Sequence, residues 1–100
     1  MGGTAGSPER QRIDKWLWFA RVVRTRRLAQ DLAAAGHVRI NGQRVQSTSH
    51  PVRLGDVLTI ALEGRVRVLE VAAFVERRGG APAAALLYRD LSPPPPGRRD

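Results

Sequence analysis

Residues 25–45 read TRRLAQDLAAAGHVRINGQRV, and the spacing of apolar side chains changes once within this stretch. Up to Gly36, the residues Leu28, Leu32 and Ala35 are spaced i, i+4 and i+7, which predicts a helix that buries this side. Thr25 precedes them as a helix-capping residue type, because its hydroxyl can accept a hydrogen bond from a free backbone amide. Glycine is the usual residue just past a helix end, so we expect the helix to stop at Gly36.

The residues after Gly36 alternate with a period of two, which predicts a pair of strands. Two short runs, 38–40 (VRI) and 43–45 (QRV), flank Asn41 and Gly42. An Asn-Gly pair favours the positive φ angles of a type I′ turn, so we predict a hairpin. Its arginines alternate with apolar residues and should point outward.

A first helix is predicted upstream, with Asp14 as its N-cap residue. Its expected core side is formed by Ile13, Trp16, Leu17, Ala20 and Val23. Trp18 falls on the opposite side, where it either packs beneath the C-terminal strands or contacts a partner. Only about two residues separate the two helices, so we expect them to form a compact pair.

The remainder of the chain alternates between strand and turn signals. Strands are expected at residues 57–60, 65–68, 71–75 and 83–88. Gly79 and Gly80 lie between the last two runs and are expected to form a hairpin turn. The predicted fold class is α+β, with two N-terminal helices packed on a small, mostly antiparallel, twisted sheet.

The length of 100 residues allows one small domain. We expect a disordered lead over residues 1–11, a single domain with C-terminal strands over residues 12–91, and a Pro-rich tail over residues 92–100. The sequence shows neither a membrane-spanning apolar run nor a secretory signal. We therefore expect a cytoplasmic monomer with no membrane contact.

Residues suited to catalysis or metal binding are scarce. The chain has no cysteine and two histidines, His37 and His50, at no metal-motif spacing. Ser47, Thr48 and Ser49 lie near His50, but no acidic residue completes a triad. We therefore expect no enzyme activity, no cofactor and no metal.

The positive charge is concentrated near the predicted helices. Seventeen basic against nine acidic residues give a formal net charge of +8, which predicts a polyanionic partner. Arg24, Arg26 and Arg27 surround the predicted start of the second helix, where acidic residues would be the stabilising choice. Free backbone amides and guanidinium groups together make a phosphate pocket. We expect these arginines to be available for it, because the acidic residues are too few to pair them.

Four segments, in this order, resemble the RNA-binding domain named after small-subunit ribosomal protein S-four. They are RIDKWLWFAR from Arg12, RTRRLAQD from Arg24, GHVRINGQRV from Gly36 and LGDVLTI from Leu54. The WLW run of the first helix and AAALLYRD from Ala83 resemble, more narrowly, the bacterial ribosome-associated heat-shock protein fifteen family. The resemblance implies an alpha-L RNA-binding motif. It also implies, as partners, the ribosomal RNA of the large subunit and a nearby tRNA, in stress-related ribosome recycling.

Carried over by position, the resemblance places RNA contacts on both helices and on the hairpin. The implied residues are Arg12, Asp14, Lys15, Arg24, Thr25, Arg26, Arg27, Gln30, Arg39, Asn41 and Gly42. Asp14 is expected to orient a neighbouring basic residue as well as cap its helix. Asn41 and Gly42 are expected mainly to set the turn, and their exposed amides could also meet phosphate.

These observations lead us to expect a non-enzymatic protein that recognises the backbone shape of structured RNA through arginines. Two alternatives stay open. The chain could be the RNA-targeting module of an RNA-modifying enzyme whose catalytic part lies on another chain. It could also bind duplex DNA, because the two helices could mimic a helix-turn-helix.

Overall fold

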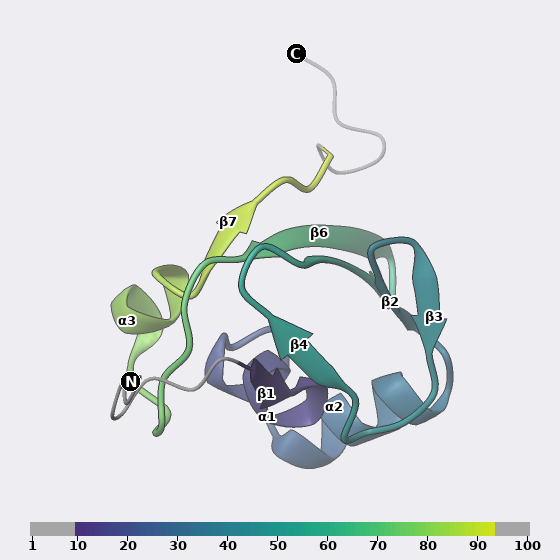
Figure 1. Ribbon diagram of the computed structural model, residues 1–100, viewed down its shortest axis with the longest axis horizontal. Coiled ribbons are helices and arrows are strands. Elements are labelled where there is room, and N and C mark those ends of the chain that lie inside the picture. The colour runs from purple at the N-terminus through teal and green to yellow at the C-terminus, as the bar shows by residue number, and fades with distance from the viewer. Residues whose placement is uncertain (1–9, 94–100) are drawn as a thin grey trace, which may run out of the picture.

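The computed structural model describes residues 10–93, which form helices and two antiparallel sheets (Figure 1). The elements, in chain order, are β1 (Arg10–Arg12), α1 (Ile13–Phe19), α2 (Arg26–Ala34), β2 (Val38–Ile40), β3 (Gln43–Val45), β4 (Pro51–Arg53), β5 (Val57–Leu62), β6 (Arg65–Val71), α3 (Ala81–Ala85) and β7 (Tyr88–Asp90). One sheet has the strand order β3-β2-β5-β6-β7, and the other pairs β1 with β4. The predicted α+β class is confirmed.

The segment from α2 to β3 adopts the predicted local structure. The Thr25 hydroxyl accepts a hydrogen bond from the Leu28 amide at 3.1 Å, as expected of a helix cap. Gly36 has a φ of 81° just past the helix, and the amides of Gly36 and His37 donate to the carbonyls of Ala33 and Leu32. This pattern is the Schellman motif, which ends a helix by satisfying its last carbonyls.

The hairpin of β2 and β3 turns at Asn41 and Gly42, whose φ angles of 51° and 86° are those of the predicted type I′ turn. β2 continues into the longer sheet by pairing with β5, with Val38 opposite Ile60. The hairpin is thereby fixed to the body of the protein.

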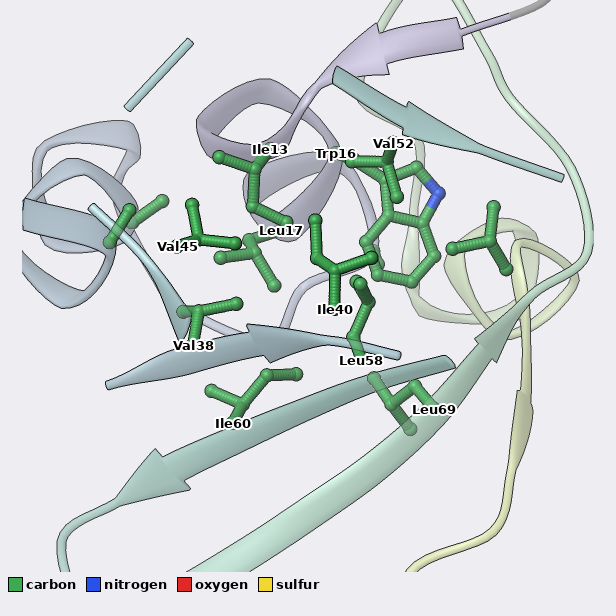
Figure 2. Close-up of a cluster of buried hydrophobic side chains, with 14 of the residues drawn as sticks. Ile13, Trp16, Leu17, Val38, Ile40, Val45, Val52, Leu58, Ile60 and Leu69 are labelled. Carbon is green, nitrogen blue, oxygen red and sulfur yellow. The ribbon is translucent and has the colours of Figure 1, made fainter. Parts of the chain in front are cut away.

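The hydrophobic core lies between α1 and the sheets. Figure 2 shows Ile13, Trp16 and Leu17 of α1 near apolar side chains of the strands. The strand residues labelled there are Val38, Ile40, Val45, Val52, Leu58, Ile60 and Leu69. The indole Nε1 of Trp16 donates a hydrogen bond to the Ala73 carbonyl at 3.2 Å, so its polar atom is also satisfied.

The predicted core side of α2 was wrong. The structure buries Ala29 and Ala33, whereas Leu28 and Ala35 are exposed and Leu32 is partly buried. The buried side of α2 packs against α1, and small alanine side chains allow that close approach. Spacing alone could not separate the leucine stripe from the alanine stripe, since both follow the helical period.

The ends of the domain also differ from the prediction. Residues 10 and 11, assigned to the disordered lead, lie in β1, and the rest of that lead lies outside the described residues. The predicted strand over 71–75 was wrong beyond Val71, where β6 ends. In place of the strand over 83–88, α3 begins after Gly80, with Pro82 in its first turn. Proline favours a helix start and alanine favours helix, and these signals outweigh the strand pattern. Most of the Pro-rich tail lies outside the described residues.

Trp18 packs under the C-terminal part of the chain. The Arg78 guanidinium lies over its ring at 5.3 Å, and Arg78 Nε donates to the Trp18 carbonyl at 3.0 Å. Of the two roles considered for Trp18, packing within the protein therefore describes its position in the structure. No helix in residues 10–93 is long and apolar enough to cross a membrane.

Candidate nucleic-acid interface

Asp14 is the centre of a polar cluster that joins α1 to α2. The prediction that Asp14 is the N-cap residue was wrong. Arg12 holds that position, and Asp14 lies fully buried in the first turn of the helix. Its carboxylate accepts hydrogen bonds from Arg12 Nε and Nη2, both at 3.1 Å, from Arg26 Nε at 3.4 Å and from Gln30 Nε2 at 3.1 Å. The Lys15 amide donates to the same carboxylate at 2.8 Å. Three side chains implied to contact RNA therefore meet at one buried anion.

The ionisation of Asp14 is favoured by these partners. Burial alone would raise its pKa, because a buried carboxylate loses hydration. The hydrogen bonds from Arg12 and Gln30, with the charges of Arg26 and Arg12, outweigh burial and hold the pKa of Asp14 below its usual value. The carboxylate is therefore charged at neutral pH and fixes the guanidinium groups around it.

This lowered pKa predicts acid sensitivity. Because the folded-state pKa of Asp14 is lower than its unfolded value, its contribution to stability is present above about pH 4 and is lost as the pH falls through the folded pKa. The free energy of unfolding, measured by circular dichroism at decreasing pH, should fall less steeply below about pH 4 in Asp14→Asn than in the unaltered chain. Part of the dependence should remain, since hydrogen bonds from Ser92 and the Arg67 guanidinium also lower the pKa of Asp90. An unchanged acid transition in Asp14→Asn would contradict the assignment.

The expectation that the α2 arginines find no acidic partner was wrong for two of them. Arg26 pairs with Asp14, and Arg27 pairs with Asp31 at 3.4 Å. The second pair is exposed on both sides and contributes little stability. Arg12 and Arg26 share the one Asp14 carboxylate, so this group keeps a net positive charge, with their side chains 47% and 38% exposed. Pairing therefore positions these two guanidinium groups without neutralising them.

The start of α2 keeps the features of an anion site. Arg24 is exposed just before the helix and forms no ion pair within residues 10–93. The backbone amides of Arg26 and Arg27 have no acceptor in that range, whereas the Leu28 amide is capped by Thr25. Thr25 therefore caps the helix, and a phosphate bound at this end would be able to accept hydrogen bonds from the two free amides.

The small sheet of β1 and β4, hereafter the ribbon, adds arginines that the sequence did not single out as RNA contacts. Arg10 lies opposite Arg53 and Gln11 opposite Val52. Gln11 and Val52 are buried on one face, so Arg10, Arg12 and Arg53 share the other, exposed face. Like charges placed opposite each other destabilise a strand pair. The ribbon therefore carries a charge arrangement that folding does not favour.

Two hollows connect the ribbon to the predicted residues. One, of about 410 Å³, is lined by Arg10, Gln11, Arg12, Lys15 and Glu76. The other, of about 530 Å³, is lined by Ile40, Asn41, Gln43, Arg44, Val45, His50, Pro51, Arg53 and Asp56. Because Arg53 lies opposite Arg10, the ribbon is the bridge between the α1 cluster and the hairpin. Arg10 and Arg53 carried no motif signal, and only their positive charge could have suggested them. Arg44 lies within the segment GHVRINGQRV but was not among the implied contacts.

The hairpin residues are held mainly by their own turn. Asn41 donates to the Asp56 carboxylate at 3.1 Å and accepts from the Val57 amide at 3.0 Å. Arg39 is exposed and donates to the Gly42 carbonyl at 3.4 Å. Asn41 and Gly42 thus shape the hairpin, while Arg39 is the exposed cation there. Within the described range, no group of acidic residues and histidines is arranged to hold a metal ion.

Comparisons with known proteins agree with this architecture. A family profile described as "S4 domain" matches residues 11–58. "Heat shock protein 15" of Escherichia coli (strain K12) is 43% identical over 81 residues, which cover 81% of this chain and 60% of that protein. The "Heat shock protein 15 homolog" of Aeromonas salmonicida is 40% identical over 93 residues, covering 90% of this chain and 67% of that protein. This chain therefore spans about three fifths of the length of the first of these relatives.

A solved structure extends the agreement to three dimensions. The Vibrio cholerae Heat Shock Protein 15 structure superposes with a TM-score of 0.76 at 38% identity, covering 82% of each chain. That protein is described as trimeric. That description stands against the expectation of a monomer.

Proposed function

This chain belongs to the heat shock protein 15 family, a non-enzymatic family with an S4 RNA-binding domain, and from that premise we propose that it binds structured RNA through the α1–α2 cluster, the ribbon and the hairpin. The observation that carries the proposal is the ribbon. Arg10 and Arg53 lie opposite each other, without an acidic partner within residues 10–93. A phosphate between them replaces repulsion by two charge-assisted hydrogen bonds.

Two groups of arginines would bind consecutive segments of the RNA backbone. One segment would lie against the α1–α2 cluster, where its phosphates would meet Arg12, Arg24 and Arg26. The phosphates of the next backbone segment would bind Arg10 and Arg53 on the ribbon. The exposed guanidinium groups are spread over several elements and read backbone shape rather than base sequence. The remaining predicted residues border this surface or support it; they are Lys15, Thr25, Arg27, Gln30, Arg39, Asn41 and Gly42.

We propose large-subunit ribosomal RNA as the ligand, with tRNA nearby, in the cytoplasm. The support is the sequence resemblance to ribosome-associated relatives, and stress-related recycling of stalled large subunits is the proposed setting. Sedimentation with purified ribosomal subunits tests it. Co-sedimentation with the free large subunit, and not with the small subunit, is expected; equal pelleting with both would overturn the choice of ligand.

Duplex DNA is the competing ligand, and the salt dependence of binding reports how many phosphates the protein neutralises. If about six phosphates are neutralised, the logarithm of the binding constant should fall with the logarithm of salt concentration at a slope of about −4 for RNA. The measurement is fluorescence anisotropy of a labelled hairpin RNA, with duplex DNA of equal length as competitor at the same salt. DNA that competes as well as unlabelled RNA would contradict RNA preference.

Assembly forms a second part of the proposal. We propose that this chain self-associates, since the Vibrio cholerae relative is described as trimeric and the two chains share their fold over most of their length. A cyclic trimer requires contacts between two different surfaces of neighbouring copies.

A further inference from the structure

α2 carries a stripe of apolar side chains that the fold leaves partly uncovered. Leu28 and Ala35 are exposed, Leu28 to 44%, whereas Leu32 is partly buried and packs against the core. Together with Val23 and Leu62 they form the floor of a groove of about 410 Å³. An exposed leucine that continues into an apolar groove marks an interaction site more often than a single exposed residue does.

The groove lies on the side of α2 away from Arg26 and Gln30. A helix turns by about 100° per residue, so Leu28 is about 200° and Ala35 about 180° around the axis from Arg26. Arg26 faces the Asp14 carboxylate, as does Gln30 one turn later. The two sides of α2 can therefore contact different partners at once.

The rim of the groove is acidic on a strongly basic protein. Asp31 and Glu63 both line it, with His37 between the helix and the sheet. Glu63 forms no ion pair within residues 10–93, and Asp31 is held only by the exposed pair with Arg27. Two carboxylates repel phosphate, so an RNA backbone does not fit here.

A second copy of this chain has the complementary chemistry. It carries a formal net charge of +8, and its surface exposes apolar side chains outside the groove, of which Leu86 is 74% and Leu54 is 58% exposed. Leu54 follows the exposed Arg53, so an apolar side chain beside a cation is available. The apolar floor of the groove can bury an apolar side chain of such a surface, and the acidic rim attracts its basic residues.

We propose that the α2 groove receives a different surface of a second copy, and that this is the contact by which the chain self-associates. The inference rests on the self-association proposed above and not on RNA binding. The contact is heterologous, because an acidic groove that met its own copy would bring like charges together.

Sedimentation equilibrium of the full chain, over a range of protein concentrations, tests the proposal. The unaltered chain should form species larger than the monomer. Leu28→Lys and Glu63→Lys should each weaken association at least tenfold, because one places a charge in the apolar floor and the other reverses the rim. Val66→Lys is the matched control, since Val66 is also 44% exposed but lies on β6 outside the groove.

The hairpin-RNA assay on the same variants separates the two proposals. RNA affinity should stay within twofold for all three variants at concentrations where the chain is monomeric. Association that persists in Leu28→Lys and Glu63→Lys, or that falls equally in Val66→Lys, overturns the groove as the interface. A chain that binds RNA but stays monomeric at every concentration overturns self-association and leaves RNA binding intact. Loss of RNA binding with association preserved overturns only the RNA proposal.

Discussion

Replacing Arg53 with glutamate is expected to lower the affinity for structured RNA by about 10- to 100-fold while the protein stays as stable as before or becomes slightly more stable. Arg53 lies opposite Arg10 on the ribbon, so Arg53→Glu turns a like-charge pair into an opposite-charge pair. The same change removes one phosphate contact and adds a repulsive charge. Anisotropy with a labelled hairpin RNA and thermal unfolding by circular dichroism measure the two effects.

Arg65→Glu is the matched control for this experiment. Arg65 is exposed at the start of β6 and lines neither of the two hollows, and its reversal changes the net charge by the same amount. Its effect on RNA affinity should be clearly smaller. Equal losses in the two variants would show that total charge, and not the ribbon, attracts the RNA. Arg26 does not allow this test, because its replacement by glutamate would place a second carboxylate beside buried Asp14.

Replacing Asp14 with alanine is expected to destabilise the protein by about 3 kcal/mol and lower its melting temperature by about 15 °C. The substitution leaves the side chains of Arg12, Arg26 and Gln30 without their shared acceptor and the Lys15 amide without a side-chain partner. RNA affinity should fall at least tenfold even at temperatures where the variant is folded, because the arginines lose their fixed positions.

Asp31→Ala is the control for the stability measurement, because it also removes a carboxylate paired with an arginine. The Arg27–Asp31 pair is exposed on both sides, so the expected change is within about 0.5 kcal/mol. Similar melting temperatures for Asp14→Ala and the unaltered chain would show that the buried cluster does not stabilise the fold. Unchanged RNA affinity in folded Asp14→Ala would reject its positioning role.

The sequence predicted those parts of the fold that depend on neighbouring residues. Thr25 and Gly36 bound α2, and Asn41 with Gly42 turns the hairpin, because each acts on the backbone beside it. The side of α2 that would be buried could not be predicted in this way. Two stripes follow the helical period, and only the closeness of α1 decides that alanines and not leucines are enclosed.

In the candidate site, too, the sequence indicated residues within local motifs but not residues brought together by the fold. The cluster of Arg12, Asp14 and Arg26 comes from segments that the sequence resemblance singled out. The capping role that the residue pattern predicted for Asp14 is not found in the structure. Arg10 and Arg53 were missed because their pairing joins residues far apart in the chain, through strands of three residues each. Short strands without a turn between them leave no periodic signal. RNA contact by any of these residues stays a prediction until binding is measured.

The carboxylate shared by Arg12 and Arg26 has a consequence for the thermodynamics of binding. A long side chain that is free in solution must give up rotamer freedom when it meets a ligand, and this loss weakens binding. Here the two guanidinium groups are already oriented in the unliganded protein, so that entropy is lost during folding instead. The surface is preorganised, and a nucleic acid whose phosphates do not match its spacing gains little from side-chain adjustment.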